Sequence, residues 1–115
     1  MDLNQLPTPN PSMSPERRKE LGRLLKAIPG VKKVYFQPPE NVKLEYPCII
    51  YVRDDVETLF ASNLPYLQTK RYLVTIIDQD PDSVIPDTVA ALPLSGFIRR
   101  FETQGLNHDI YSLYF

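Results

Sequence analysis

The spacing of apolar side chains changes several times along the chain, and each change predicts a different element. Over residues 14–30 (SPERRKELGRLLKAIPG), apolar residues recur at helical spacing. Ser14 is a favourable N-cap and Pro15 fits the first helical turn, whereas Pro29 and Gly30 end the helix. The apolar stripe expected on this helix consists of Leu21, Leu24, Leu25 and Ile28.

Five later segments are rich in β-branched and aromatic residues, which predicts strands. Two of them, CIIYVRD and TKRYLVTIID, are apolar on both faces, as is typical of strands inside a sheet. Residues 55–68 between these two are too polar and aperiodic for a firm element, so a loop or a mobile β-arm is expected there. The strand segments are 31–36, 48–54, 69–78, 95–103 and 110–115.

Together the elements predict a small α+β fold in the order α-β-β-β-α-β-β. It should contain a mixed or antiparallel sheet of four to five strands with two helices packed on it. A chain of 115 residues is one domain by length, and we assign residues 15–115 to it. Residues 1–14 are polar, contain three prolines and lack hydrophobic periodicity, which indicates a flexible N-terminal arm.

Four aspartates follow the third predicted strand within ten positions. Asp78, Asp80 and Asp82 match the first, third and fifth ligands of a helix-loop-helix calcium site. The match then fails, because the sixth position needs Gly and is Ser83, and the twelfth needs Glu and is Val89. We therefore interpret the run as a turn and predict no metal site.

The same run precedes the second predicted helix, residues 84–92 (VIPDTVAAL). Asp82 or Ser83 is expected to cap this helix, and Pro86 is tolerated in its first turn. Asp87, the fourth aspartate, interacts favourably with the positive end of the helix dipole. The residues expected on its buried face are Ile85, Val89 and Leu92.

Residue types that carry catalysis are few. The single cysteine, Cys48, lies in an apolar run and is expected to be a buried small hydrophobe. The single histidine, His108, is expected in a hairpin turn beside Asp109, where local hydrogen bonding is the ordinary role. There is no GxSxG motif, no Gly-rich phosphate loop and no His/Cys cluster. The sequence predicts neither an enzyme nor a cofactor.

The net charge of −1 does not suit a protein that coats nucleic acid or binds membranes through a polybasic surface. No apolar run approaches the roughly 18 to 20 residues that span a bilayer, so a soluble, intracellular protein is expected. Residues 1–46 carry a net charge of +3 and residues 47–115 a net charge of −4. This asymmetry is either ordinary solvated surface or a pair of complementary faces that meet between copies.

A hairpin is predicted near the chain end, with its turn at Gly105 and Asn107 close by. Arg99 and Arg100 lie on the strand before that turn. Because adjacent strand residues face opposite ways, both arginines cannot be buried without partners. At least one is expected to face water or a partner molecule.

The element order, together with three segments, resembles phage tail terminator and tail completion proteins. The segments are VYFQPPENVKLEYPCIIY (34–51), YLVTIIDQDPDSVIPD (72–87) and LNHDIYSLYF (106–115), and the resemblance spans roughly residues 15–115. It implies a virion protein, made in the host cytoplasm, that forms a ring of typically six subunits on the last layer of the tail tube. There it would stop tube growth and join the tube protein to the head connector.

The resemblance also implies where contacts lie. Long connections such as 37–46 and 54–68 are natural contact elements, and the latter carries hydrophobes that the monomer core does not need. Arg99 and Arg100 are candidates for lining a passage for DNA, although the net charge of the chain gives no general support for strong duplex binding. Another neck component remains an alternative, as does a small metal-dependent nuclease that uses the aspartates. The residues expected at subunit or tube contacts are Leu59, Phe60, Leu64, Tyr66, Arg17, Arg18 and Arg23.

Overall fold

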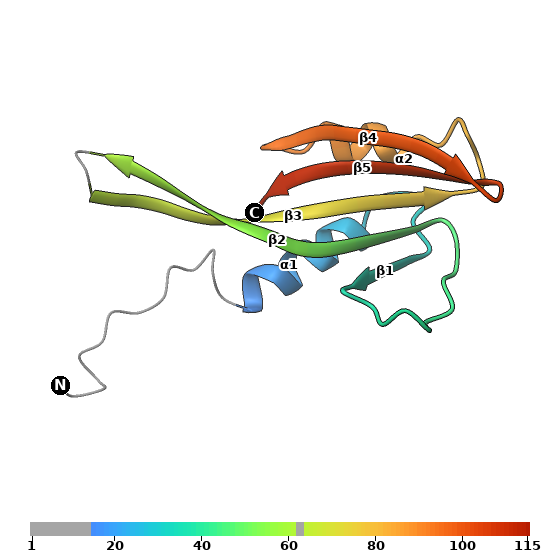
Figure 1. Ribbon diagram of the computed structural model, residues 1–115, viewed down its shortest axis with the longest axis horizontal. Helices are drawn as coiled ribbons and strands as arrows, with labels where there is room; N and C mark the ends of the chain where they lie inside the picture. The colour runs from blue at the N-terminus through green and yellow to red at the C-terminus, as the bar shows by residue number, and fades with distance from the viewer. Residues whose placement is uncertain (1–14, 62–63) are drawn as a thin grey trace.

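The α+β prediction is confirmed by the computed structural model in Figure 1, which describes residues 15–61 and 64–115, with side chains described outside 55–69. Its element order is the predicted one. Neither helix is long and apolar enough to cross a membrane, among the residues described. The elements are α1 (Pro15–Lys26), β1 (Lys33–Phe36), β2 (Cys48–Ala61), β3 (Leu64–Asp78), α2 (Ile85–Ala90), β4 (Ser95–Thr103) and β5 (Leu106–Tyr114).

The five described strands form one mixed sheet in the order β1-β2-β3-β5-β4. Strand β1 pairs with β2 in parallel, and the other three pairings are antiparallel. Strand β3 is the middle strand and β2 lies inside the sheet, as their apolar faces predict. The two edges of the sheet are therefore the short strand β1 and the strand β4.

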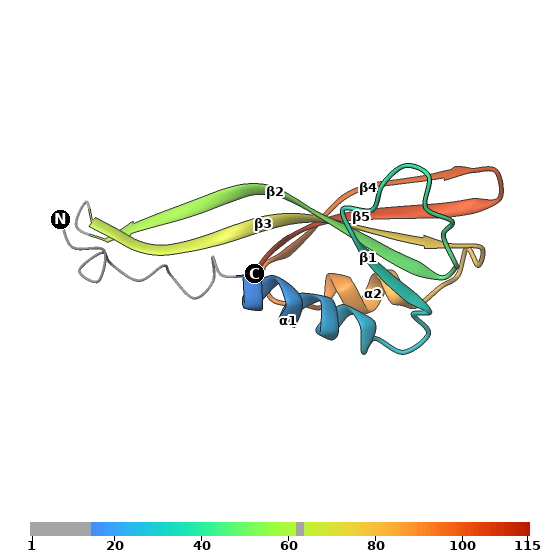
Figure 2. The same ribbon diagram turned by 90° about the horizontal axis from the view of Figure 1, so that it is seen from below.

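Both helices cover the same face of this sheet (Figure 2). The strand residues on that face alternate with those on the other, so Ile49 and Tyr51 of β2 share it with Ile76 and Val74 of β3. Helix α1 contributes its buried stripe to the same core. The fully buried side chains of this core include Leu21, Leu25, Ile49, Tyr72, Val74, Ile76, Val89 and Leu113.

Leu24, one of the four residues of the predicted apolar stripe, is more exposed than the other three. Leu21 and Leu25 are fully buried and Ile28 is 7% exposed, whereas Leu24 is 38% exposed. On a helix wheel Leu24 lies at the rim of the stripe, where it meets the border between α1 and the segment after α2 rather than the core. Leu24 therefore lies at the exposed edge of the predicted stripe, and the other three residues are buried.

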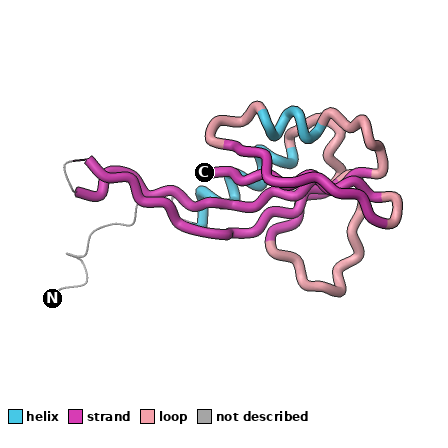
Figure 3. The backbone as a smooth tube through the Cα atoms, turned by 45° about the horizontal axis from the view of Figure 1, so that its top comes forward, coloured by secondary structure: helices cyan, strands magenta, loops and turns pink. Residues whose placement is uncertain are grey.

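The described residues of the segment 55–68 lie on strands and not in a loop. Strand β2 continues through it to Ala61 and β3 begins at Leu64, with partners from Asp55↔Arg71 to Ala61↔Leu64. Because β3 pairs with β5 only over Arg71–Asp78, this part of the sheet has two strands and extends beyond the body (Figures 1 and 3). We call strand segments 55–61 and 64–70 the projecting hairpin. Of the two expectations, the β-arm is correct and the loop is wrong.

The N-cap of helix α2 lies one or two residues after the expected caps, Asp82 and Ser83. Its N-cap is Val84, which makes no side-chain capping bond, so neither Asp82 nor Ser83 is the N-cap. The Ser83 hydroxyl still accepts a hydrogen bond from the Ile85 amide at 3.3 Å, in place of a cap. Pro86 lies in the first turn, as predicted.

Candidate functional site

The projecting hairpin is the most unusual feature of the molecule. Its base is anchored: the Phe115 amide donates to the Lys70 carbonyl at 3.1 Å, and Arg71 Nε donates to Asp54 Oδ2 at 2.7 Å. Beyond this base, seven residues of β3 extend for about 20 Å at 3.3 Å per residue. The hairpin helps to give the molecule its long dimension of 56 Å, against 30 and 23 Å in the other two directions.

Such a hairpin is poorly stabilised by itself. A two-stranded ribbon is at best marginally stable in water, and both of its edges present unpaired backbone N–H and C=O groups. Its sequence is nevertheless rich in large apolar residues. The predicted contact residues Leu59, Phe60, Leu64 and Tyr66 lie on these two strands, and their side chains are outside the described residues. A partner surface would supply the stabilisation that the isolated hairpin lacks.

A second feature is a shallow basic hollow of about 380 Å³ between α1 and the edge strand β1. Its floor is apolar: the rings of Phe36 and Tyr51 lie 4.9 Å apart, and the absence of a side chain at Gly22 lets Tyr51 approach α1. We define the basic hollow by its lining residues, which are Lys19, Gly22, Arg23, Lys26, Lys33, Val34, Phe36 and Tyr51.

The rim of the basic hollow carries positive side chains, and three of them form no ion pair with a described carboxylate. Among the described residues, no carboxylate forms an ion pair with Lys19, Arg23 or Lys26, and all three are exposed. Lys33 reaches Glu45 at 3.8 Å, at the outer limit of an ion pair. Of the cations that line this hollow, the sequence analysis assigned only Arg23 to an interface. The spacing of positions 19, 23 and 26 at i, i+4 and i+7 is the signal that places all three cations on one helix face.

The other two arginines expected at an interface are engaged within the chain. Arg17 Nε donates to the Phe115 carbonyl at 3.0 Å, and its guanidinium lies 3.7 Å from the centre of the Phe115 ring. Arg18 lies 4.4 Å over the Phe36 ring. These contacts fix α1 against the sheet, and Arg23 alone of the three presents its charge to the surface of the basic hollow.

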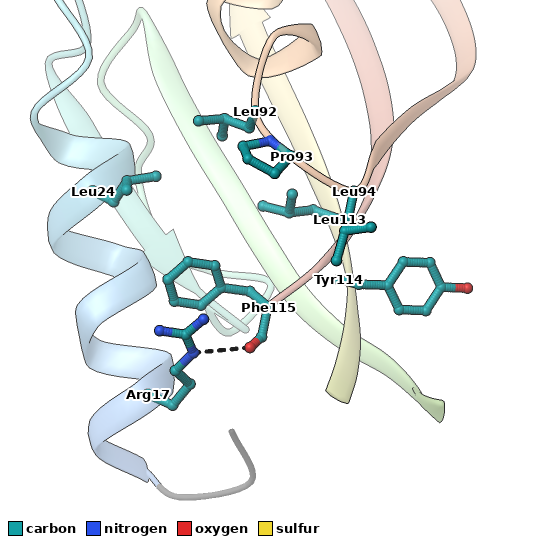
Figure 4. Close-up of a pocket in the computed structure, with 8 residues that line it drawn as sticks. All are labelled: Arg17, Leu24, Leu92, Pro93, Leu94, Leu113, Tyr114 and Phe115. Atoms are coloured by element: carbon teal, nitrogen blue, oxygen red, sulfur yellow. Dashed lines mark hydrogen bonds between the residues drawn. The ribbon is translucent and has the colours of Figure 1, made fainter. Parts of the chain in front are cut away.

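A small cleft lies between α1 and the segment that joins α2 to β4 (Figure 4). It measures about 190 Å³, less than the roughly 300–1,000 Å³ typical of small-molecule sites. The Tyr114 ring points away from it in the close-up. Its lining is almost wholly apolar, so it offers packing and no chemistry. The lining residues are Arg17, Leu24, Leu92, Pro93, Leu94, Leu113, Tyr114 and Phe115.

The aspartate run makes turns, as predicted. Asp78 Oδ1 accepts a hydrogen bond from the Asp80 amide at 2.9 Å, and Asp80 Oδ1 accepts one from the Asp82 amide at 2.9 Å. Each carboxylate therefore shapes the backbone two residues later. Within residues 15–61 and 64–115, no group of three or more His, Cys, Asp or Glu side chains is arranged to hold a metal ion.

Arg99 and Arg100 point to opposite faces of β4, because their cross-strand partners are the adjacent residues Ile110 and Asp109. Arg100 donates to the Pro81 carbonyl at 2.8 Å and lies 3.5 Å from Asp109, so it ties the loop before α2 to the sheet. Arg99 lies over the Phe101 ring at 4.7 Å. Both are exposed, and among the described residues no carboxylate forms an ion pair with Arg99.

His108 is not in the turn where the sequence placed it. Strand β5 already begins at Leu106, since the left-handed φ angles of Gln104 (53°) and Gly105 (77°) complete the turn. The His108 ring stacks on Phe101 at 4.5 Å, on the face opposite to Asp109. Burial raises the pKa of Asp109, which Arg100 partly offsets. His108 and Asp109 cannot act together as a catalytic pair, because their side chains leave strand β5 on opposite sides.

Cys48 is fully buried, as predicted, and burial together with the charge of Asp78 raises the pKa of its thiol to about 11. At pH 8 only about one thiol in a thousand would be ionised, against about a quarter for an ordinary cysteine. We expect a thiol reagent such as DTNB to label the folded protein at least 100-fold more slowly than the protein in urea. Equal rates in both states would contradict the buried position.

Comparisons with protein-family models, with curated proteins and with solved structures found no match to this chain.

Proposed function

We propose that this chain is a structural virion protein that forms a ring at the end of a phage tail tube. There it stops tube polymerisation and provides the joining surface for the head connector. Its partners are further copies of itself, the tube protein and a neck protein, at the head–tail junction of the virion. The proposal rests on the sequence resemblance and on the projecting hairpin.

The projecting hairpin is the observation that carries the proposal. It places Leu59, Phe60, Leu64 and Tyr66 on a two-stranded segment that lies beyond the pairing of β3 with β5. Each large apolar side chain that a partner buries contributes about 1.5–3 kcal/mol. A protein that acts by assembly has a use for a segment with this sequence.

A ring also requires contacts between two different surfaces of the same chain, since only head-to-tail contacts close into rings of more than two subunits. The projecting hairpin and the basic hollow are different surfaces, and the charge asymmetry between the two parts of the sequence favours contact between unlike surfaces. Arg99 remains the candidate residue for contact with DNA that passes through the centre of the ring. Arg100 is held by Pro81 and Asp109 and is the weaker candidate.

The experiment is negative-stain microscopy of tails assembled with and without this chain. We expect tails of uniform length when it is present, and tube of uncontrolled length when it is absent. Tubes of uniform length that fail to join heads would instead identify the chain as a different neck component. Tails that are unchanged in both length and joining would refute a role at the head–tail junction.

A further inference from the structure

We propose that the basic hollow is the receptor for the projecting hairpin of a second copy of this chain. The inference rests on the proposed function, because it names the surface through which the subunits of the assembly meet. The occupant of the hollow would be the hairpin of a neighbouring copy, and the sequence alone did not indicate this hollow.

Charge complementarity is the first argument. Within the strand segments 55–61 and 64–70, the acidic residues are Asp55 and Glu57 and the single cation is Lys70, which is 8% exposed at the base. The rim of the hollow presents Lys19, Arg23 and Lys26 with no ion pairs among the described residues. Opposite charges placed around a contact steer the approach and fix its register.

Apolar matching is the second argument. The floor of the hollow is formed by Val34, Phe36 and Tyr51, and its volume of about 380 Å³ has room for a large side chain. The hairpin offers such side chains in its sequence, Phe60 and Tyr66 among them. Stable interfaces place large apolar anchors at the centre and charges at the rim, which is the arrangement that these two surfaces would form together.

The cleft in Figure 4 is one competing receptor, and it fits less well. It has half the volume of the basic hollow, about 190 Å³. Its one cation is Arg17, which already bonds the Phe115 carbonyl at 3.0 Å and lies 3.5 Å from Glu20. An acidic hairpin would find no free positive charge there.

The contact must be made between two molecules. The projecting hairpin extends toward one end of the long dimension, whereas β1 lies toward the other, as both Figures 1 and 2 show. The hairpin also runs on from strands β2 and β3, so it cannot fold back onto its own α1 without breaking their pairing. Donor and receptor are different surfaces, so each copy would use one of each and the contacts would run head to tail.

The unpaired strand edges add a further source of affinity. Strand β1 is an edge of the sheet, and it borders the hollow through Lys33, Val34 and Phe36. A hairpin edge that approaches β1 would pair its free backbone groups with those of β1, as peptides do when they add a strand to an exposed edge.

The test uses two full-length variants that each remove one side of the contact. The receptor variant is Lys19→Glu with Arg23→Glu, and the donor variant is Phe60→Asp. Sedimentation at protein concentrations on the order of 100 μM should show at least a tenfold weaker self-association for each variant than for the unmodified chain. The matched control is Lys32→Glu with Lys43→Glu, which makes the same charge change outside the hollow and should associate as the unmodified chain does.

Mixing the two variants gives the sharper result. The donor variant retains an intact hollow and the receptor variant an intact hairpin, so an equimolar mixture should form a complex of two chains and nothing larger. A second variant reverses the charges of the hairpin and of the hollow in the same chain. Adding Asp55→Lys and Glu57→Lys to the receptor variant should restore association. It does not depend on Phe60 and keeps the proposal testable if Phe60→Asp fails to fold.

Three outcomes would overturn the inference. The first is a receptor variant that associates as tightly as the unmodified chain, which refutes the hollow as receptor while leaving assembly intact. The second is loss of duplex DNA binding in the receptor variant without loss of association, which would make the hollow a phosphate-backbone site. The third is an unmodified chain that stays monomeric both in solution and on tail tubes, which refutes the contact. Failure of the proposed function is recognised separately, by tails that are unaffected when the chain is absent.

Discussion

Replacing Phe60 with Asp should leave the monomer folded while it abolishes assembly. Phe60 pairs with Pro65 on the projecting hairpin, beyond the pairing of β3 with β5, so the monomer should lose no more than about 0.5 kcal/mol of unfolding free energy. A charge buried without a partner at an interface costs several kcal/mol, which corresponds to a loss of association of about 100-fold or more. Light scattering after size exclusion measures the association, and urea unfolding measures the stability.

The matched control for this variant is Val84→Asp. It makes the same apolar-to-acidic change on the body of the molecule, at a side chain that is 66% exposed. It should leave association unchanged, and the stability should not fall, because Asp is a favourable residue at the N-cap of α2. If the Phe60→Asp protein is unfolded, Phe60 belongs to the core of the monomer. If the variant folds and assembles normally, Phe60 is excluded from the contact.

Replacing Tyr72 with Ala should have the largest effect on stability. Tyr72 lies at the centre of the core at 1% exposure, with its ring 5.9 Å from that of Tyr51. Deletion of a large buried ring typically costs about 3–5 kcal/mol, from a total stability of about 5–15 kcal/mol in a small domain. The midpoint of urea unfolding should therefore fall by about a fifth or more, at any protein concentration.

The comparison for this variant is Leu94→Ala, because Leu94 is 66% exposed. We expect a change within about 0.5 kcal/mol for this surface truncation. A loss below about 1 kcal/mol for Tyr72→Ala would mean that the helices do not close over β3 as described. Dependence of that loss on protein concentration would mean that Tyr72 acts in an interface instead of in the core.

Strong local patterns made most of the fold predictable. The segment SGFIRRFET matches β4 at both ends, because it is flanked by the apolar end of the α2 region and by a tight turn at Gly105. The projecting hairpin gave a weak signal for a physical reason. Alternation marks a strand with one buried face, and a two-stranded segment outside the body has no buried face within its own chain.

The candidate site was less predictable because it depends on tertiary contacts. Lys19 and Arg23 follow from helical spacing, but a hollow between them and Lys33 exists only once β1 packs beside α1. The same applies to Arg17, which the sequence placed at an interface and which instead holds Phe115. The aspartates were the easier case, since a missing Gly and Glu already excluded the calcium loop and favoured the hydrogen bonds now seen at Asp78 and Asp80.

The central claim is that this chain acts by assembly with copies of itself through the projecting hairpin. Its most direct test is the native mass of the purified protein, measured alone and after addition of tail tubes. A single chain has a mass of 13.3 kDa, and we predict a defined multiple of that mass, on tubes if not already in solution. A protein that remains a single chain under both conditions would contradict the claim.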